Sequence, residues 1–397
     1  MPSFGLAFLS RSALRDAERL MLGDTAGVRD EVGFLLVHQR YADRFFPGTS
    51  VLHTRLRYVL FVPWILERLK AQGEGVRFLD ALRAEETALA ERLKGESYGV
   101  IGRLMLPDAS NQPPSYVYWT ALAKWGLLDP KPTGRTWSRA DIGALIAAAR
   151  GKEPRDDDGR PLATSVWPVA ELPSPPEGWD SGGPLGFDLL PRERRHLAKL
   201  IRATRCPHDP DARSLLALLA GSDVADAEAC WDPTVLDIAG RHRAALERAG
   251  RAASLAAIGR GVYAALVERQ KERDGRAVGR RHRDALSDVL ARHAERAVTL
   301  DADLLIADLQ PDLPCRVEEV LRHTLTWLRG SGNRASQLLD VYRRAEIKRK
   351  GARARLAEEQ SGIDRRIEWN ADEHPAAEPL HYRWGQVRLM LQDLEGA

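Results

Sequence analysis

Residues 45–66 read FFPGTSVLHTRLRYVLFVPWIL and combine a chain break, a helix-capping pair and a long apolar run. Pro47 and Gly48 interrupt the preceding segment, because proline cannot donate a helical hydrogen bond and glycine favours turns. Either Thr49 or Ser50 can then cap the next helix through its hydroxyl oxygen. The stretch therefore predicts that a new helix starts immediately after the break.

Two arginines accompany this predicted helix, which we expect to run from about Ser50 towards Gln72. Arg55 and Arg57 fall within its first two turns. The free backbone N–H groups of a helix N-terminus attract anions, and arginine makes strong contacts with phosphate oxygens. Thr49, Ser50, Arg55 and Arg57 are therefore candidates for an anion-binding or nucleic-acid-binding site. Alternatively, the arginines belong to buried ion pairs, and the stretch determines the fold instead of forming a site.

The stretch at 46–64 fits the pattern FPGTS-x-x-x-TR-x-RY-x-x-F-x-PW, and related motifs occur at 98–103, 114–119, 125–127 and 381–384. In these motifs the chain resembles a large family of uncharacterised bacterial proteins of similar length. Members of that family are often encoded beside helicases and phospholipase-D-type nucleases in antiphage defence islands. The resemblance implies a defence-system component, and it implies no known activity.

The charge balance excludes a strongly basic or strongly acidic protein. The 397 residues include 59 lysines and arginines against 56 aspartates and glutamates, which gives a net charge of +3. A field that steers nucleic acid to the whole molecule is therefore absent, and any basic surface must be local. The hydrophobic fraction of 44% is that of a globular protein, and the length allows two or three cores.

Cysteine content and the first residues bear on the cellular location. Cys206, Cys230 and Cys315 are too few and too widely spaced for a disulfide framework, which favours a reducing compartment. Residues 1–22 contain no long apolar segment after a basic flank, so neither a signal peptide nor a membrane span is predicted. We expect a cytoplasmic protein without a membrane partner.

Helical periodicity dominates the sequence and predicts a mostly α, multi-helical protein of two domains. We expect an N-terminal helical domain at 1–150, a connection rich in proline and glycine at 151–186, and a C-terminal helical domain at 187–397. Trp167 and Trp179 indicate that the connection is pinned against a domain, because such large apolar side chains need burial.

Local signals predict three further elements. Ser138 and Asp141 form a Ser-x-x-Asp capping box that should open a helix. Residues 233–274 predict either one long helix or a hairpin interrupted near Gly259 and Gly261. The apolar residues of the last segment predict an amphipathic helix that docks on the body of the protein.

One part of the N-terminal domain resembles a winged helix-turn-helix in layout. A short helix at 98–106 would be followed by a helix at 115–124 and by a wing hairpin at 126–136. In such folds the second helix reads the major groove and a basic wing contacts phosphate. Lys131 and Arg135 are placed for that contact.

The aromatic residues of the second helix favour a different interpretation. Tyr116, Tyr118 and Trp119 lie where a recognition helix usually carries polar side chains. They are more typical of a protein-protein module or of ordinary core packing. Both interpretations predict a helix at 115–124.

The most basic predicted helix is 342–355, which carries seven basic residues and one acidic residue, Glu346, for a net charge of +6. Such a cluster would bind the phosphate backbone without reading bases. Alternatively, it is a solvated helix that forms salt bridges with neighbours such as Glu358 and Glu359. The candidate phosphate contacts are Arg343, Arg344, Lys348, Arg349, Lys350 and Arg353.

Motifs for catalysis and metal binding are lacking in the sequence. It contains no phosphate-binding Gly-x-x-x-x-Gly-Lys-Ser/Thr loop, no His-Glu-x-x-His and no His-x-Lys pair of the phospholipase-D kind. Cys206, His208 and Asp209 are metal-ligand types close together, but a structural zinc site needs a second pair. We expect no catalytic set, no metal and no cofactor, which favours a non-enzymatic protein.

These features predict a non-enzymatic, nucleic-acid-associated subunit of a bacterial antiphage defence system. The defence context comes from the family resemblance, and the basic clusters give the reason to expect nucleic acid. The expected partners are DNA, bound weakly and without sequence preference, and helicase or nuclease proteins encoded nearby. A second hypothesis is a protein-protein scaffold that uses the aromatic residues of 116–125. A third is an unrecognised enzyme that processes a phosphodiester or nucleotide with His53, Arg55 and Arg57 near its substrate.

Overall fold

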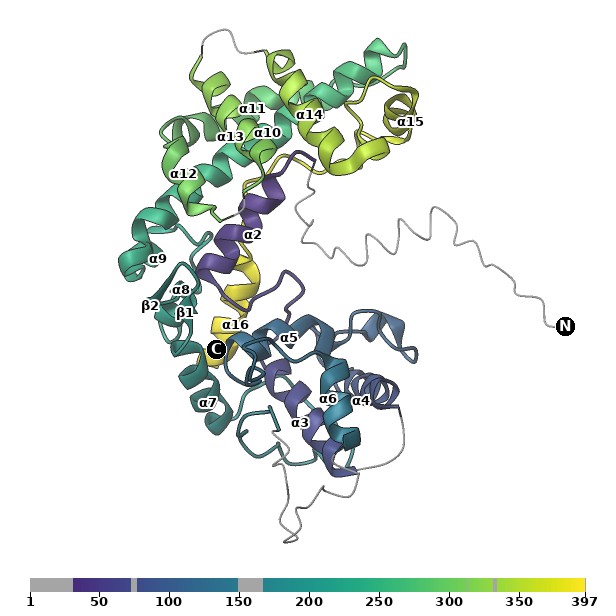
Figure 1. The fold of residues 1–397 in the computed structure, drawn as a ribbon, viewed down its shortest axis with the longest axis vertical. Coiled ribbons are helices and arrows are strands. Elements are labelled where there is room, and N and C mark those ends of the chain that lie inside the picture. The colour runs from purple at the N-terminus through teal and green to yellow at the C-terminus, as the bar shows by residue number, and fades with distance from the viewer. Residues whose placement is uncertain (1–30, 73–76, 149–166, 312, 331–333, 397) are drawn as a thin grey trace, which may run out of the picture. The chain divides into compact units, whose positions relative to one another are not determined.

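The computed structural model describes residues 31–72, 77–148, 167–311, 313–330 and 334–396. These residues form fifteen α-helices, four short 3-10 helices and two strands (Figure 1). The strands, β1 (Arg205–Cys206) and β2 (Asp209–Arg213), pair antiparallel. The prediction of a mostly α protein is confirmed.

Contacts between residues divide the chain into two compact units. Unit 1 comprises Arg248–Leu380 and the segment that ends at Arg40, and unit 2 comprises Tyr41–Glu247 and the segment that begins at His381. Two helices, α2 (Phe34–Phe45) and α10 (Arg243–Arg273), each contain a boundary between the units. The two units do not coincide with the expected domains at 1–150 and 187–397, because each unit contains residues from both. That 1–150 and 187–397 fold independently remains a prediction.

Unit 1 is built around the buried part of α10. From Ala252 to Val267, every residue of this helix except Arg260 is buried. A helix that is apolar all round needs neighbours on every side. The other elements of unit 1 are α11 (Arg281–Val298), α12 (Ala302–Asp308), α13 (Cys315–Arg329), η3 (Ala335–Leu338), α14 (Leu339–Lys350), η4 (Gly351–Arg353) and α15 (Gln360–Glu368).

α10 continues without interruption through Gly259 and Gly261, so the long helix is the correct one of the two alternatives. It begins only at Arg243, after the short α9 (Pro233–Ile238) and η2 (Gly240–His242). A Cβ atom at Gly259 would collide with the ring of Phe34 on α2. This glycine therefore allows close helix packing, a role that the sequence pattern does not distinguish from a break.

Unit 2 contains the apolar helix of the opening motif. This helix, α3 (Tyr58–Gln72), packs against α4 and α5, and α4 packs against α6 (Figure 1). Every residue from Tyr58 to Leu66 is buried. The other elements of unit 2 are α4 (Phe78–Arg92), η1 (Arg103–Met105), α5 (Pro114–Lys124), α6 (Arg139–Ala148), α7 (Pro191–Arg202), β1, β2, α8 (Leu215–Leu219), α9, η2 and α16 (Trp384–Glu395).

The last helix, α16, packs against α7 within unit 2. Trp384, Val387 and Leu391 are buried, and the indole N–H of Trp384 donates to the carbonyl of Ala227 at 2.7 Å. The prediction that the last segment docks on the body of the protein is confirmed.

The capping box formed by Ser138 and Asp141 is confirmed as well. In it, the Ser138 hydroxyl oxygen accepts the Asp141 N–H at 3.1 Å, the Asp141 carboxylate accepts the Ser138 N–H at 2.7 Å, and α6 starts directly after Ser138.

The described part of the connection, 167–186, belongs to unit 2 and lies against α3 and α4. Trp179 is buried and stacks on Phe61 of α3, with ring centroids 5.9 Å apart and planes 4° from parallel. Arg92 of α4 donates hydrogen bonds to the carbonyl groups of 178, 179 and 183. The expectation of a pinned connection is confirmed for these residues, and 151–166 lie outside the described part of the chain.

The winged helix-turn-helix layout is not confirmed. The expected helix at 98–106 is reduced to the three residues of η1, and the expected wing at 126–136 forms no strand pair within itself. Leu128 instead bridges to Val169, and the Asp129 N–H donates to the carbonyl of Pro168 at 2.8 Å. The connection therefore takes the backbone hydrogen bonds of 127–129, and within the segment the Lys131 N–H donates to the carbonyl of Arg135 at 2.8 Å without forming a strand pair.

Glu86 joins α4 to the start of α5. Only 4% of this residue is exposed, and its carboxylate accepts the backbone N–H of Ser115 in the first turn of α5. Burial raises the pKa of Glu86 from 4.5 to about 7. The folded protein therefore keeps a proton on this carboxyl group over a pH range in which the unfolded chain has lost it.

This difference predicts a specific pH dependence of stability. As the pH rises from about 4.5 through about 7, the contribution of Glu86 to the free energy of unfolding falls, by up to about 1.4 kcal/mol per pH unit. Glu86→Gln should remove that fall, and urea unfolding between about pH 5 and pH 8 measures it. Glu91→Gln, at a half-buried position of the same helix in a surface ion pair with Lys94, is the control. Parallel pH profiles for the wild type and Glu86→Gln would contradict the prediction.

Candidate functional site

Arg55 is held by a carboxylate from the far end of the sequence. Its Nε donates to both oxygens of Asp393 on α16, at 2.9 and 3.1 Å, and its Nη2 lies 2.8 Å from Oδ1. Asp393 also accepts the backbone N–H of Leu56 at 2.7 Å. The side chain of Arg55 is 21% exposed and that of Asp393 is 8% exposed. Arg55 is therefore one partner of a largely buried, bidentate ion pair.

Arg57 is paired in the same way but is buried more deeply. Its Nη2 donates to Glu193 of α7 at 2.8 Å, and its Nη1 donates to the carbonyl of Gly186 at 2.8 Å. The side chain of Glu193 is fully buried, and it also accepts the N–H of Leu190 at the start of α7. The pair thus joins the segment that directly precedes α3 to the beginning of α7.

Neither Thr49 nor Ser50 caps a helix, because α3 begins only at Tyr58. The Thr49 hydroxyl donates to the carbonyl of Phe46 at 2.7 Å, and the Ser50 hydroxyl oxygen accepts the N–H of Leu52 at 3.2 Å. The expected helix start at Ser50 is therefore wrong. The expected position of both arginines in its first turns is wrong for the same reason.

Tertiary hydrogen bonds explain the late start of α3. The hydroxyl oxygen of Tyr118 on α5 accepts the N–H groups of Thr54 and Arg55, at 2.9 and 3.1 Å, and Asp393 accepts the next N–H. These donors are held by side chains from other elements, so the backbone at 54–56 does not need a helix to satisfy them. A propensity pattern contains no information about such distant acceptors.

The motif at 381–384 meets the motif at 46–64 inside unit 2. Arg383 donates to the carbonyl of Thr49 at 2.8 Å and pairs with Asp43 at 2.6 Å. Trp384 lies against Phe46, with ring centroids 6.0 Å apart. Anion binding by Thr49, Ser50, Arg55 and Arg57 stays a prediction. The contacts of both arginines are nevertheless explained by the alternative in which the stretch determines the fold.

His53 is placed for packing. It is 2% exposed and stacks on the ring of Tyr118, with centroids 4.2 Å apart and planes 2° from parallel. One ring nitrogen, Nε2, lies 3.2 Å from the carbonyl oxygen of Val117. Burial lowers the pKa of His53 to about 3, so the ring is neutral at pH 7.

The basic segment 342–355 is not one helix. α14 ends at Lys350, and Gly351, with a positive φ of 55°, leads into the short η4. Glu346, the one acidic residue of this segment, is fully buried. It accepts the Tyr263 hydroxyl at 2.6 Å and the N–H of Leu356 at 2.8 Å. The segment therefore folds back around a buried carboxylate.

The six candidate phosphate contacts of this segment separate into two kinds. Arg343 pairs with Glu358 and Asp340, and Lys350 pairs with Glu346 at 3.3 Å, so these two charges are neutralised within unit 1. The pair with Glu358 is a contact of the kind that the salt-bridge alternative predicts, although Glu358 lies outside α14. The remaining four side chains are exposed: Arg344, Lys348, Arg349 and Arg353.

Lys131 and Arg135, the candidate wing contacts, also differ from each other. Lys131 pairs with Asp141 of α6 at 2.8 Å and lies over the ring of Trp137, 5.1 Å from its centroid. Arg135 is exposed. Lys131 thus belongs to the local structure that holds the start of α6, and Arg135 is the freer of the two.

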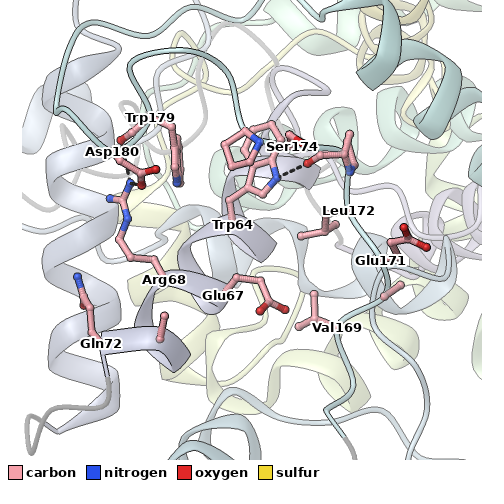
Figure 2. Close-up of a pocket in the computed structure, with 14 residues that line it drawn as sticks. Trp64, Glu67, Arg68, Gln72, Val169, Glu171, Leu172, Ser174, Trp179 and Asp180 are labelled. Atoms are coloured by element: carbon pink, nitrogen blue, oxygen red, sulfur yellow. Dashed lines mark hydrogen bonds and ion pairs between the residues drawn. The ribbon is translucent and has the colours of Figure 1, made fainter.

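A pocket of about 660 Å³ opens between α3 and the connection (Figure 2). Trp64 and Trp179 are among its apolar lining residues, and the indole N–H of Trp64 donates to the carbonyl of Pro173 at 3.0 Å. Arg68, the one cation of its lining, lies 4.6 Å from the ring centroid of Trp179 and pairs with Glu85. Because Glu67, Glu171 and Asp180 also line this pocket, its charge does not suit phosphate.

Metal-ligand residues do not gather in the described ranges of the chain. No group of three or more histidine, cysteine, aspartate or glutamate side chains there is close enough to hold an ion. Cys206, which the sequence placed beside two other ligand types, is buried in β1 with its sulfur 3.8 Å from the carbonyl of Arg44. Among the described helices, none has the length and apolar character needed to span a bilayer.

Comparison with known proteins identifies one family model. Residues 11–136 match the model of a family described as "Family of unknown function (DUF6361)". The match includes the motifs at 46–64, 98–103, 114–119 and 125–127, and it ends before the motif at 381–384. No curated protein and no solved structure matches the chain.

Replacing Arg57 with alanine should lower the free energy of unfolding by about 3–5 kcal/mol, because the buried carboxylate of Glu193 would lose its charged partner. Urea unfolding measures the change. Arg135→Ala removes an exposed arginine of the same unit and should change stability by less than about 0.5 kcal/mol. If Arg57→Ala were as stable as Arg135→Ala and nucleic-acid binding fell, Arg57 would be a ligand-binding group and the ion-pair interpretation would be wrong.

Proposed function

We propose that the protein is a non-enzymatic, nucleic-acid-associated subunit that contacts the phosphate backbone and works with a helicase or nuclease in bacterial antiphage defence. One observation carries the nucleic-acid part. Arg344, Lys348 and Arg353 are exposed, and none of them pairs with a carboxylate in the part of the chain that the structure describes. Cations without internal partners are available to phosphate.

The positions of these cations suit a backbone contact. Arg344 and Lys348 are four residues apart on α14 and so project from the same face of the helix. Arg353 follows in η4, after the turn at Gly351. Such contacts hold phosphates without selecting bases, which supports weak binding without sequence preference.

The defence context and the cytoplasmic location rest on sequence. The defence context comes from the resemblance carried by the motifs at 46–64 and 381–384, and the reducing compartment comes from the cysteine pattern. The partner in this proposal is a helicase or nuclease encoded nearby. DNA is the nucleic acid such a partner would share with the protein.

The two alternatives have less support from the contacts. A scaffold that uses the aromatic residues of α5 would need them at the surface, yet Tyr118 and Trp125 are buried and only Tyr116 is largely exposed. An enzyme that uses His53 with Arg55 and Arg57 would have to expose a buried, neutral imidazole and break the ion pair of each arginine with its carboxylate partner. Both rearrangements are costly.

Reversing the charges of Arg344, Lys348 and Arg353 tests the proposal. In the variant with Arg344→Glu, Lys348→Glu and Arg353→Glu, the affinity for duplex DNA of scrambled sequence should fall. The slope of log affinity against log salt should fall by about 2–3, since each lost phosphate contact removes about 0.7–0.9. Fluorescence anisotropy across a salt titration measures both quantities.

The matched control reverses three arginines of the same unit that already pair with carboxylates: Arg280, Arg316 and Arg322. It changes the net charge equally and should keep most of the salt slope of the wild type. Equal binding by the wild type and the first variant would remove Arg344, Lys348 and Arg353 from the proposal. A wild-type protein that binds no nucleic acid at low salt would overturn the function itself.

Capture of neighbour-encoded proteins separates the leading proposal from the scaffold alternative. A helicase or nuclease that is held through shared nucleic acid should be lost when the lysate is treated with a nonspecific nuclease. A partner held by direct protein contact should remain after this treatment. Unchanged recovery of a neighbour-encoded partner with and without nuclease would favour the scaffold.

A further inference from the structure

A basic groove lies in unit 2, and its lining includes none of the phosphate contacts expected from the sequence. Its volume is about 770 Å³, and α7, the two strands and the end of α16 line it. One acidic residue, Glu395, belongs to the lining. The six basic residues of the lining are Arg194, Arg195, Lys199, Arg202, Arg205 and Arg213.

None of these six cations forms an ion pair with a carboxylate of the described residues. Three of them are held by backbone carbonyl groups instead: Arg194 donates to Leu189 at 3.2 Å, Arg202 to Ala220 at 3.1 Å, and Arg205 to Asp211 at 3.3 Å. A carbonyl fixes the position of a guanidinium without cancelling its charge. The groove therefore keeps its positive charge, unlike Arg55 and Arg57 of the same unit, which each have a carboxylate partner.

The cations of α7 form a row. Arg195, Lys199 and Arg202 are exposed and follow one another at intervals of four and three residues, so they share one face of the helix. The row extends over about 10 Å, since a helix rises about 1.5 Å per residue. One strand of duplex DNA presents about three phosphates over that length.

The two strands add a pair of like charges beside this row. Arg205 of β1 lies directly opposite Arg213 of β2 in the antiparallel register, and both are exposed. Like charges directly opposite each other destabilise a strand pair. An anion placed between them would relieve this repulsion, which gives the groove a physical reason to take up negative charge.

From these observations we propose that the groove binds the phosphate backbone of a nucleic acid. The inference rests on the proposed function and deepens it, because it gives unit 2 a contact surface of its own. Five of the six cations are arginines, whose planar guanidinium groups match phosphate oxygens in pairs. A single small phosphate would need only one or two converging cations. Six cations spread over a helix and two strands suit a polyanion with regularly spaced charges.

The test reverses three groove charges whose side chains form no hydrogen bond or ion pair with another described residue: Arg195→Glu, Lys199→Glu and Arg213→Glu. Binding of scrambled duplex DNA should weaken at least tenfold at low salt, and the salt slope should fall by about 2–3. The control reverses three exposed cations of unit 2 that already have carboxylate partners: Lys70, Lys94 and Arg243. Urea midpoints of all variants establish that they are folded, and glutamine replaces glutamate in any variant that is not.

The outcomes separate this inference from the proposed function. If the wild type binds DNA and the groove variant binds equally well while the α14 variant does not, the groove inference is wrong and the proposed function stands. If both variants lose affinity and the controls do not, both proposals are supported. If the wild type binds an acidic polypeptide such as polyglutamate but no DNA or RNA, the groove serves a protein partner, and both proposals are overturned.

Discussion

The ion pair between Arg55 and Asp393 is the contact on which the arrangement of unit 2 depends most. Asp393 neutralises the guanidinium and also accepts the N–H of Leu56, so it holds the backbone turn that leads into α3. The second pair, Arg57 with Glu193, ties the same turn to α7. Two carboxylates from distant segments therefore position the helix that forms the apolar centre of this unit.

Features that depend on neighbours in the sequence could be predicted, and those that depend on distant partners could not. The capping box of Ser138 and Asp141 and the burial of α16 follow from local patterns, and both are confirmed. The sequence predicts a start of α3 at about Ser50, but the helix starts at Tyr58, because the acceptors for its preceding N–H groups come from α5 and α16. Gly259 illustrates the same limit. A glycine is needed there because the ring of Phe34, which is distant in the sequence, leaves no room for a Cβ atom.

Charge counting identifies basic segments but does not tell which charges are available. The segment 342–355 carries a net +6 in sequence, yet Arg343 and Lys350 are neutralised by carboxylates and Glu346 is buried. The groove of α7 was missed for the opposite reason. Its cations come from a helix and from two strands, and only the fold brings them together. A pattern of basic residues at intervals of four and three in 195–202 was the available signal.

The distance along the chain between Arg55 and Asp393 has a consequence for synthesis. The two residues are 338 positions apart, and a ribosome adding about 5–20 residues per second takes about 20–70 seconds to cover that interval. During this time the turn before α3 has emerged without its carboxylate. The completed arrangement of unit 2 is therefore reached only after α16 has been translated, although α4 and α5, which pack on α3, are available much earlier.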